Sequence, residues 1–194
     1  MGDRLDAAAS QRLSAVNKNI VAAAAVSVAL ATAGLLTYAA TKPDAVKVQR
    51  STKIAAAPGR LFPLIDDIRA FNNWSPDVRE DPSMQLRYEG AAFGPGAGFT
   101  WDSEKAGAGH MEVVETVPTY KVVMRLDFTK PMQATKHVEF TKAPTVGGSQ
   151  VSWATAGPMP YLHKLMSIFF DVDEMVGTDV EAGLAKLKSL AERA

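Results

Sequence analysis

The sequence predicts an α+β fold in which a curved antiparallel sheet wraps around one long C-terminal helix, with a transmembrane helix preceding both. Three observations support this prediction. Residues 19–41 carry no charge, residues 46–155 contain short runs of alternating apolar and polar side chains, and residues 162–190 place apolar side chains every three or four positions. A period of two is typical of strands and a period near 3.6 is typical of helices.

The composition is that of an ordinary globular protein with one sizeable domain. The chain has 194 residues, of which 47% are hydrophobic and 22% are charged, and this balance excludes an intrinsically disordered chain. Lys plus Arg equals Asp plus Glu at 21 each, so we expect no nucleic acid as a partner. Because the chain has no cysteine, it can form no disulfide and no thiolate metal site. The oligomeric state stays open.

The charge-free stretch predicts a transmembrane helix over residues 20–41, after an N-terminal tail of residues 1–19. As a helix, residues 20–40 would be about 31 Å long, which matches a hydrocarbon core of about 30 Å. The stretch has no polar stripe at helical spacing, so an amphipathic surface helix is disfavoured. We therefore expect a single-pass membrane anchor. A cleaved signal peptide is the alternative, and its best cleavage site is Thr37-Tyr38-Ala39.

The orientation of this anchor is less strongly determined by charge. Three basic residues precede the span and four follow it closely, so the positive-inside rule is almost balanced. We expect the short tail to stay inside the cell. The rest of the chain, residues 43–194, would then be periplasmic or otherwise extracytoplasmic.

Pro43 ends the helical stretch and begins the predicted domain of residues 43–194. Residues 46–54 alternate as a strand, and Ala57-Pro58 then begins an amphipathic helix that Asn72–Pro76 breaks. Further strands, separated by turn residues, are predicted at 84–88, 98–104, 110–117, 120–128, 132–141 and 149–155. The helix over residues 162–190 needs a broad apolar partner, and the sheet is the available one.

This order of elements is the helix-grip arrangement. Within it, residues 43–194 resemble the SRPBCC superfamily, also called START-like, in its polyketide cyclase/dehydrase branch. The matching strings are RSTKIAAAPGRLFPLIDDIRAFNNWSP (50–76), YEGAAFGPGAGFTW (88–101), GAGHMEVVETVP (107–118) and FDVDEMVGTDVEAGLAKLK (170–188). Residues 41–44, TKPD, resemble the junction that follows a single hydrophobic span in bacterial members. The resemblance implies a deep, mainly apolar cavity between sheet and helix that holds a lipid, polyketide, sterol or other hydrophobic molecule.

Motifs for other chemistry are weak. The glycines at 94, 96 and 98 precede a strand, as do those at 107 and 109, so both groups predict hairpin turns and not a nucleotide loop. The three histidines lack metal-ligand spacing, and no GxSxG elbow is present. The acidic residues 171, 173 and 174 predict a solvated helix face or salt bridges to lysines of the sheet, with general acid chemistry as the alternative. We therefore expect no cofactor and no metal, and no catalytic residue is assigned.

Lys136 is the most informative candidate site residue. It falls in the register of Val138 and Phe140, on the apolar side of its strand, where the desolvated ammonium needs a carboxylate, a backbone oxygen or an anionic ligand group. The other candidates are apolar or aromatic residues expected in the cavity wall, with core packing as the alternative for each aromatic one. The full set of candidate ligand-binding residues is Trp74, Tyr88, Trp101, Met124, Leu126, Met132, Lys136 and Phe169.

Three functions remain open from the sequence. The first is a membrane-anchored domain that binds a hydrophobic small molecule or lipid. The second is an enzyme of the cyclase/dehydrase type, in which Lys136 or His110 moves a proton on a bound substrate. The third is an accessory protein whose domain serves as a docking surface. A large cavity would favour the first two, and a filled core with an exposed apolar patch would favour the third.

Overall fold

The computed structural model describes residues 2–76, 78, 81 and 83–193, with side chains from residue 19 onward. The chain divides into two compact units. The first contains the chain up to Pro43 together with Pro160–Phe169, and the second contains Asp44–Met159 and the chain from Phe170 on.

In the first unit, α1 (Gly2–Thr41) is one continuous helix that includes the residues predicted as an N-terminal tail. Its segment Asn19–Thr41 has 23 residues and a mean hydropathy of 2.1, so it is long and apolar enough to cross a membrane. The short helix α5 (Tyr161–Met166) packs against α1.

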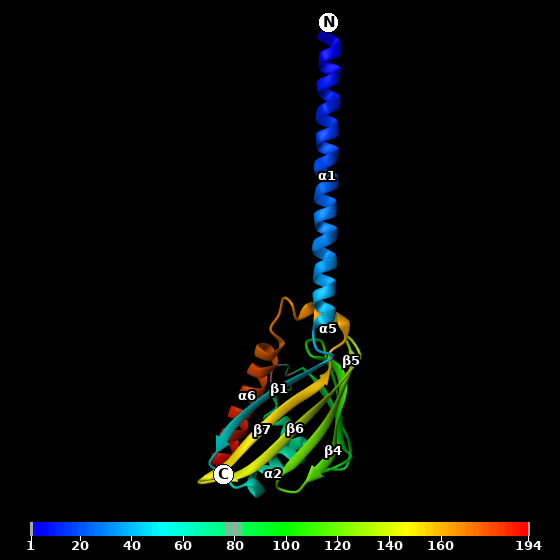
Figure 1. The fold of residues 1–194 in the computed structure, drawn as a ribbon. Coiled ribbons are helices and arrows are strands. Elements are labelled where there is room, and N and C mark those ends of the chain that lie inside the picture. The colour runs from blue at the N-terminus through cyan, green and yellow to red at the C-terminus, as the bar shows by residue number, and fades with distance from the viewer. Residues whose placement is uncertain (1, 77, 79–80, 82, 194) are drawn as a thin grey trace. The chain divides into compact units, whose positions relative to one another are not determined.

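The second unit is built on a seven-stranded antiparallel sheet with the order β1-β7-β6-β5-β4-β3-β2 (Figure 1). Its curved sheet and long C-terminal helix confirm the predicted fold class. The strands are β1 (Ala45–Ile54), β2 (Gln85–Gly90), β3 (Ala97–Ser103), β4 (Gly107–Val117), β5 (Lys121–Lys130), β6 (Ala134–Thr145) and β7 (Gly148–Pro158). Every strand run expected from the alternation is therefore present, with ends that move by up to four residues.

The first strand completes the sheet by pairing with the last. In the β1–β7 ladder, Ala45 lies opposite Pro158 and Ile54 lies opposite Ser149. The helix α6 (Val172–Arg193) runs beside β1 (Figure 1). Arg50 of β1 forms salt bridges of 2.8 Å with Asp173 and 2.7 Å with Glu181, so charge pairs tie this edge strand to the helix.

The C-terminal helix begins later than expected, and the prediction of one helix over residues 162–190 was wrong. Asp171 ends the intervening turn because its Oδ1 accepts hydrogen bonds from the backbone N–H groups of Asp173 (2.9 Å) and Glu174 (3.1 Å). These bonds satisfy two amide groups that a helix N-terminus leaves open. The apolar residues before Asp171 therefore belong to α5 and a turn, not to α6.

The helix predicted from Ala57 is divided in the same way. α2 (Pro58–Asp66) ends at Asp67, whose side chain caps α3 (Ile68–Asn72) by accepting from the N–H groups of Arg69 and Ala70. Both short helices contribute buried apolar side chains, so they cover one end of the sheet.

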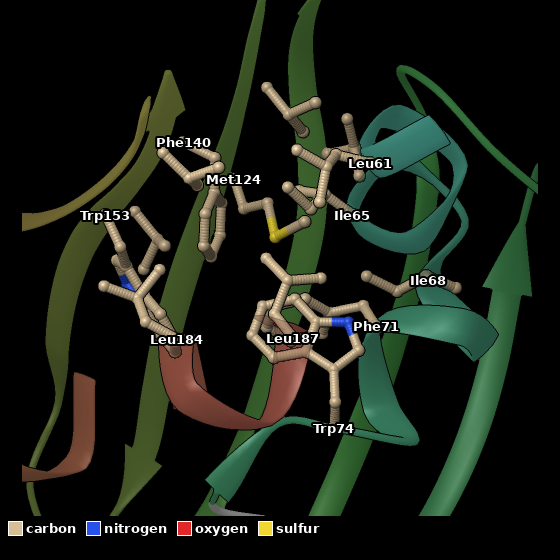
Figure 2. Packing of buried hydrophobic residues seen from close by; sticks show 14 of the residues in the cluster. Leu61, Ile65, Ile68, Phe71, Trp74, Met124, Phe140, Trp153, Leu184 and Leu187 are labelled. Atoms are coloured by element: carbon tan, nitrogen blue, oxygen red, sulfur yellow. The ribbon is translucent and has the colours of Figure 1, made fainter. Parts of the chain in front are cut away.

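The core lies between the sheet, these short helices and α6 (Figure 2). Trp74 is fully buried at its centre, and its Nε1 donates a 2.7 Å hydrogen bond to the carbonyl oxygen of Leu64. Its ring makes edge contacts with Phe71 and Trp153, at centroid distances of 5.0 and 5.8 Å. Leu187 of α6 reaches the same cluster (Figure 2), so the helix is held by apolar packing as well as by charge.

Candidate ligand cavity

A cavity of about 690 Å³ lies in the second unit, where the core stops short of filling the space beside β3, β4 and β5. Its remaining boundaries are α3, the segment that follows α3, the β3–β4 turn and the first turns of α6. The lining residues are Phe71, Ser75, Val78, Asp81, Met84, Phe99, Trp101, Lys105, Ala106, Met111, Leu126, Phe128, Met175 and Asp179.

The sheet side of the cavity is an aromatic wall. The rings of Trp101 and Phe128 meet edge to face at a centroid distance of 5.4 Å, and Phe99 lies 6.1 Å from Trp101. The indole can approach the next strand closely because its ladder partner is Gly109, where a Cβ atom would collide with the ring. This surface suits an apolar or aromatic molecule, since ring faces and edges both offer favourable contacts.

Three methionines complete the apolar lining, namely Met84, Met111 and Met175. Met111 is buried on β4, whereas Met175 on α6 is 60% exposed and lies at the open side. Methionine side chains are flexible and polarisable, so this part of the wall can adjust to the shape of a bound molecule.

The cavity also has a polar region, formed around the buried carboxylate of Asp81. Asp81 accepts hydrogen bonds from the hydroxyl groups of Ser83 and Ser103, both at 2.5 Å, and from the backbone N–H of Ser83. The hydrogen bond from Ser103, followed by that from Ser83, holds the pKa of Asp81 below its ordinary value. The carboxylate is therefore ionised at neutral pH.

Two exposed residues of opposite charge lie at the rim, Lys105 from the β3–β4 turn and Asp179 from α6. Ser75, by contrast, is only 2% exposed and adds a hydroxyl group to the interior. The cavity thus has an apolar sheet side and polar groups toward α6 and the segment after α3.

The structure brings together only some of the candidate residues. Trp101 and Leu126 line the cavity. Met124 and Trp74 are fully buried and pack in the core. Tyr88 packs at the edge of the core, where the guanidinium of Arg69 lies 4.1 Å from its ring centroid.

The remaining apolar candidates lie elsewhere. Met132 precedes β6 and is 42% exposed, and Phe169 is 67% exposed in the first unit. Neither residue is among those that line the cavity. Sequence periodicity placed Phe169 on the C-terminal helix, but the cap at Asp171 separates it from α6.

Lys136 borders the cavity without lining it. It lies opposite Leu126 in the β5–β6 ladder, and its Nζ is 5.4 Å from the ring centroid of Phe128. His110 lies on the opposite face of the sheet from its neighbour Met111, beside Thr129 in a separate shallow depression. Within the described part of the chain, no three potential ligating side chains gather to hold a metal ion.

Several cavity residues were missed by the sequence reasoning. Phe99, Met111 and Phe128 had a signal, because each alternates in register with an apolar neighbour on the same strand. Asp81 had no such signal, since an aspartate between a predicted helix and a predicted strand is usually a solvated turn residue.

Comparison with known structures identifies the fold. Protein MLL2253 from Mesorhizobium loti is 16% identical, with a TM-score of 0.57 over 77% of this chain and 98% of that one. The Aha1 dimer protein from Colwellia psychrerythraea is 14% identical, with a TM-score of 0.52 over 76% and 96%. The di-domain ARO/CYC StfQ from the steffimycin biosynthetic pathway is 13% identical, with a TM-score of 0.54 over 77% and 51%.

These identities are low, so the likenesses concern the fold. No curated protein matches the chain. The family model described as polyketide cyclase / dehydrase and lipid transport matches residues 45–192, which includes every strand and nearly all of α6. The chain therefore belongs to the polyketide cyclase/dehydrase and lipid transport family, as the resemblance of its sequence strings to the SRPBCC superfamily predicted.

Proposed function

We propose that the second unit binds a hydrophobic small molecule or lipid in the cavity, and that α1 anchors the protein to a membrane. The observation that carries the binding proposal is the cavity itself. Its volume of about 690 Å³ falls within the range of small-ligand sites, about 300 to 1,000 Å³. Its lining combines an aromatic wall with a few polar groups, which is the usual composition of such sites.

The lining also supports one orientation for the ligand. The apolar body would lie against Trp101, Leu126 and Phe128, where burial removes apolar surface from water. A polar group would be directed toward Ser75 and Asp81, because these side chains offer a hydroxyl and a carboxylate at the other side. A carboxylate favours a hydrogen-bond donor or a cation at that position.

The anchor is supported by the length and composition of α1. Residues Asn19–Thr41 would form about 35 Å of helix, slightly more than the hydrocarbon thickness of about 30 Å. A membrane location suits a poorly soluble ligand, because such a molecule partitions into the bilayer.

The catalytic alternative has less support. It needs Lys136 or His110 in the cavity, and neither residue is among the lining. The proposal is therefore binding and not proton transfer.

Photocrosslinking tests the binding proposal on the full chain in lipid vesicles. A diazirine-bearing fatty acid and the corresponding alcohol are added, irradiated and mapped to residues by mass spectrometry. We expect labels on Met84, Met111 and Leu126, which line the cavity. The lipid-facing residues of α1 would be labelled in the same sample and provide an internal control for partitioning of the probe.

Cavity-filling variants make the result specific. Leu126→Trp places a bulky indole ring in the cavity and should abolish cavity labels while labels on α1 remain. Val114→Trp, at a position that is 39% exposed and outside the lining, should change neither. Labels confined to α1 in the wild-type chain would contradict the binding proposal.

A further inference from the structure

The first unit contains a contact between α5 and the candidate transmembrane span. The Tyr161 hydroxyl donates a 2.8 Å hydrogen bond to the carbonyl oxygen of Leu36. Lys42, just after the span, places its Nζ 3.4 Å from the carbonyl oxygen of Ser167 and 5.5 Å from the ring centroid of Tyr38. The start of α5 and the turn after it are thus each joined to the end of α1, at two levels along the helix axis.

The depth of the first contact follows from helix geometry. Leu36 lies five residues before Thr41, where the span ends. At about 1.5 Å per residue, its carbonyl is about 7 to 8 Å inside the end of the apolar segment. A helix that lies in a membrane interface buries its apolar face about 5 to 10 Å into the boundary between headgroups and acyl chains.

The side chains of this segment are unusually apolar for their exposure. Tyr161, Leu162 and Met166 are 47, 50 and 47% exposed, and Phe169 is 67% exposed. Four large apolar or aromatic side chains within nine residues would be a costly surface in water. In the interfacial layer, the same side chains would be buried, and the tyrosine ring would lie at the level that aromatic residues prefer.

We propose that residues Tyr161–Phe169 form a second membrane contact, embedded in the interfacial layer of the bilayer that α1 crosses. This inference rests on the proposed anchor. It assigns a partner of defined chemistry, the lipid headgroup and upper acyl region, to a segment that lies outside the seven strands of the sheet. Lys42 then lies at the headgroup level, where a lysine ammonium reaches phosphate while its stem stays in apolar surroundings.

The absence of cysteine from the chain allows a direct test. Met166→Cys and Phe169→Cys are each labelled with an environment-sensitive fluorophore in the full chain, reconstituted into phosphatidylcholine vesicles. The vesicles contain lipids with a nitroxide quencher either near the headgroup or near the bilayer centre. We expect blue-shifted emission at both positions and stronger loss of fluorescence with the shallow quencher than with the deep one.

Two further single-cysteine variants separate the possible failures. Val28→Cys, in the middle of the span, should be quenched best by the deep quencher. Val146→Cys, fully exposed in the β6–β7 turn, should be quenched by neither. If Val28 is quenched while Met166 and Phe169 behave like Val146, the interfacial contact is overturned and the anchor stands. If Val28 also behaves like Val146, the anchor is overturned, and the interfacial contact with it.

Discussion

The indole ring of Trp101 lies directly on the backbone of Gly109, its partner across the β3–β4 ladder. A Cβ atom at position 109 would meet this ring and also the carbonyl oxygen of Asp127 on β5. The missing side chain therefore allows the large ring of Trp101 to approach β4 closely. Because Trp101 forms part of the cavity wall, this close approach leaves more space in the cavity than a displaced ring would.

Gly109→Ala should lower the free energy of unfolding by about 1 to 3 kcal/mol, the usual cost of forcing extra volume into a packed site. The indole would be pushed toward the cavity, so labelling of Met111 and Leu126 by the photoprobe should also fall. Chemical unfolding of the full chain, followed by circular dichroism, measures the first effect.

Gly59→Ala is the matched control. Gly59 is in α2 and has no atom within 4 Å of an added Cβ, so alanine should leave stability unchanged or raise it by about 0.5 to 1 kcal/mol. Equal destabilisation by both substitutions would show that Gly109 has no special role in seating Trp101.

Lys142 offers a test of charge burial. Its side chain is 1% exposed, and its Nζ has no hydrogen-bond partner among the described residues, although it lies 5.1 Å from the ring centroid of Phe62. Desolvation lowers its pKa from 10.5 to about 8, an effect that the charge of Asp66 opposes. The folded state therefore binds this proton less tightly than the unfolded state.

Lys142 therefore makes the stability of the protein depend on pH. Between pH 8 and 10.5 the unfolded chain keeps the proton that the folded chain has lost, so this residue makes stability rise with pH in that window. Lys142→Met should remove this rise and stabilise the protein at pH 7 by on the order of 2 kcal/mol. Unfolding curves at several pH values measure both effects. Lys130→Met, at an exposed lysine, should do neither, and a variant at 142 that is less stable at pH 7 would contradict the argument.

Lys136→Met tests whether the charge that borders the aromatic wall recognises a ligand. The substitution keeps the length and apolar stem but removes the ammonium near Phe128. If the charge does so, affinity for a fatty acid should fall by about 1 to 3 kcal/mol, because a charge-assisted hydrogen bond is lost, while the corresponding alcohol should bind as before. Competition against the photoprobe measures both affinities. An equal loss for acid and alcohol, or no loss for either, would place Lys136 outside ligand recognition.

The fold was predictable because its signals are local. Alternating apolar and polar residues within each segment predict the strands, and apolar residues at every third or fourth position predict the amphipathic helix α6. The late start of α6 also had a local signal, since Asp171 and Glu174 have the spacing of a helix capping box. The apolar period before Asp171 continues at helical spacing into α6, so it hides the cap when periodicity alone is considered.

The cavity was less predictable because its position depends on distances between elements. The sequence predicts the same role, a place in the cavity wall, for Trp74 and Trp101. In the structure Trp74 fills the core, whereas Trp101 lines the cavity. Gly109 was expected in a turn, and its role appears only when the strand register places it opposite Trp101. The buried carboxylate of Asp81 accepts hydrogen bonds from two serine hydroxyl groups. One of these serines, Ser103, is on β3, and the spacing of residues in the sequence does not predict this contact.

The pairing of β1 with β7 has a consequence for synthesis. The two strands are separated by roughly 100 residues, so at about 5 to 20 residues per second β1 leaves the ribosome about 5 to 20 s before its ladder partner exists. Its backbone hydrogen-bonding groups are unpaired throughout that interval. One face of β1 is polar and exposed in the complete sheet, at Lys47, Gln49, Ser51 and Lys53. These side chains keep the unpaired strand hydrated and disfavour its pairing with another nascent chain.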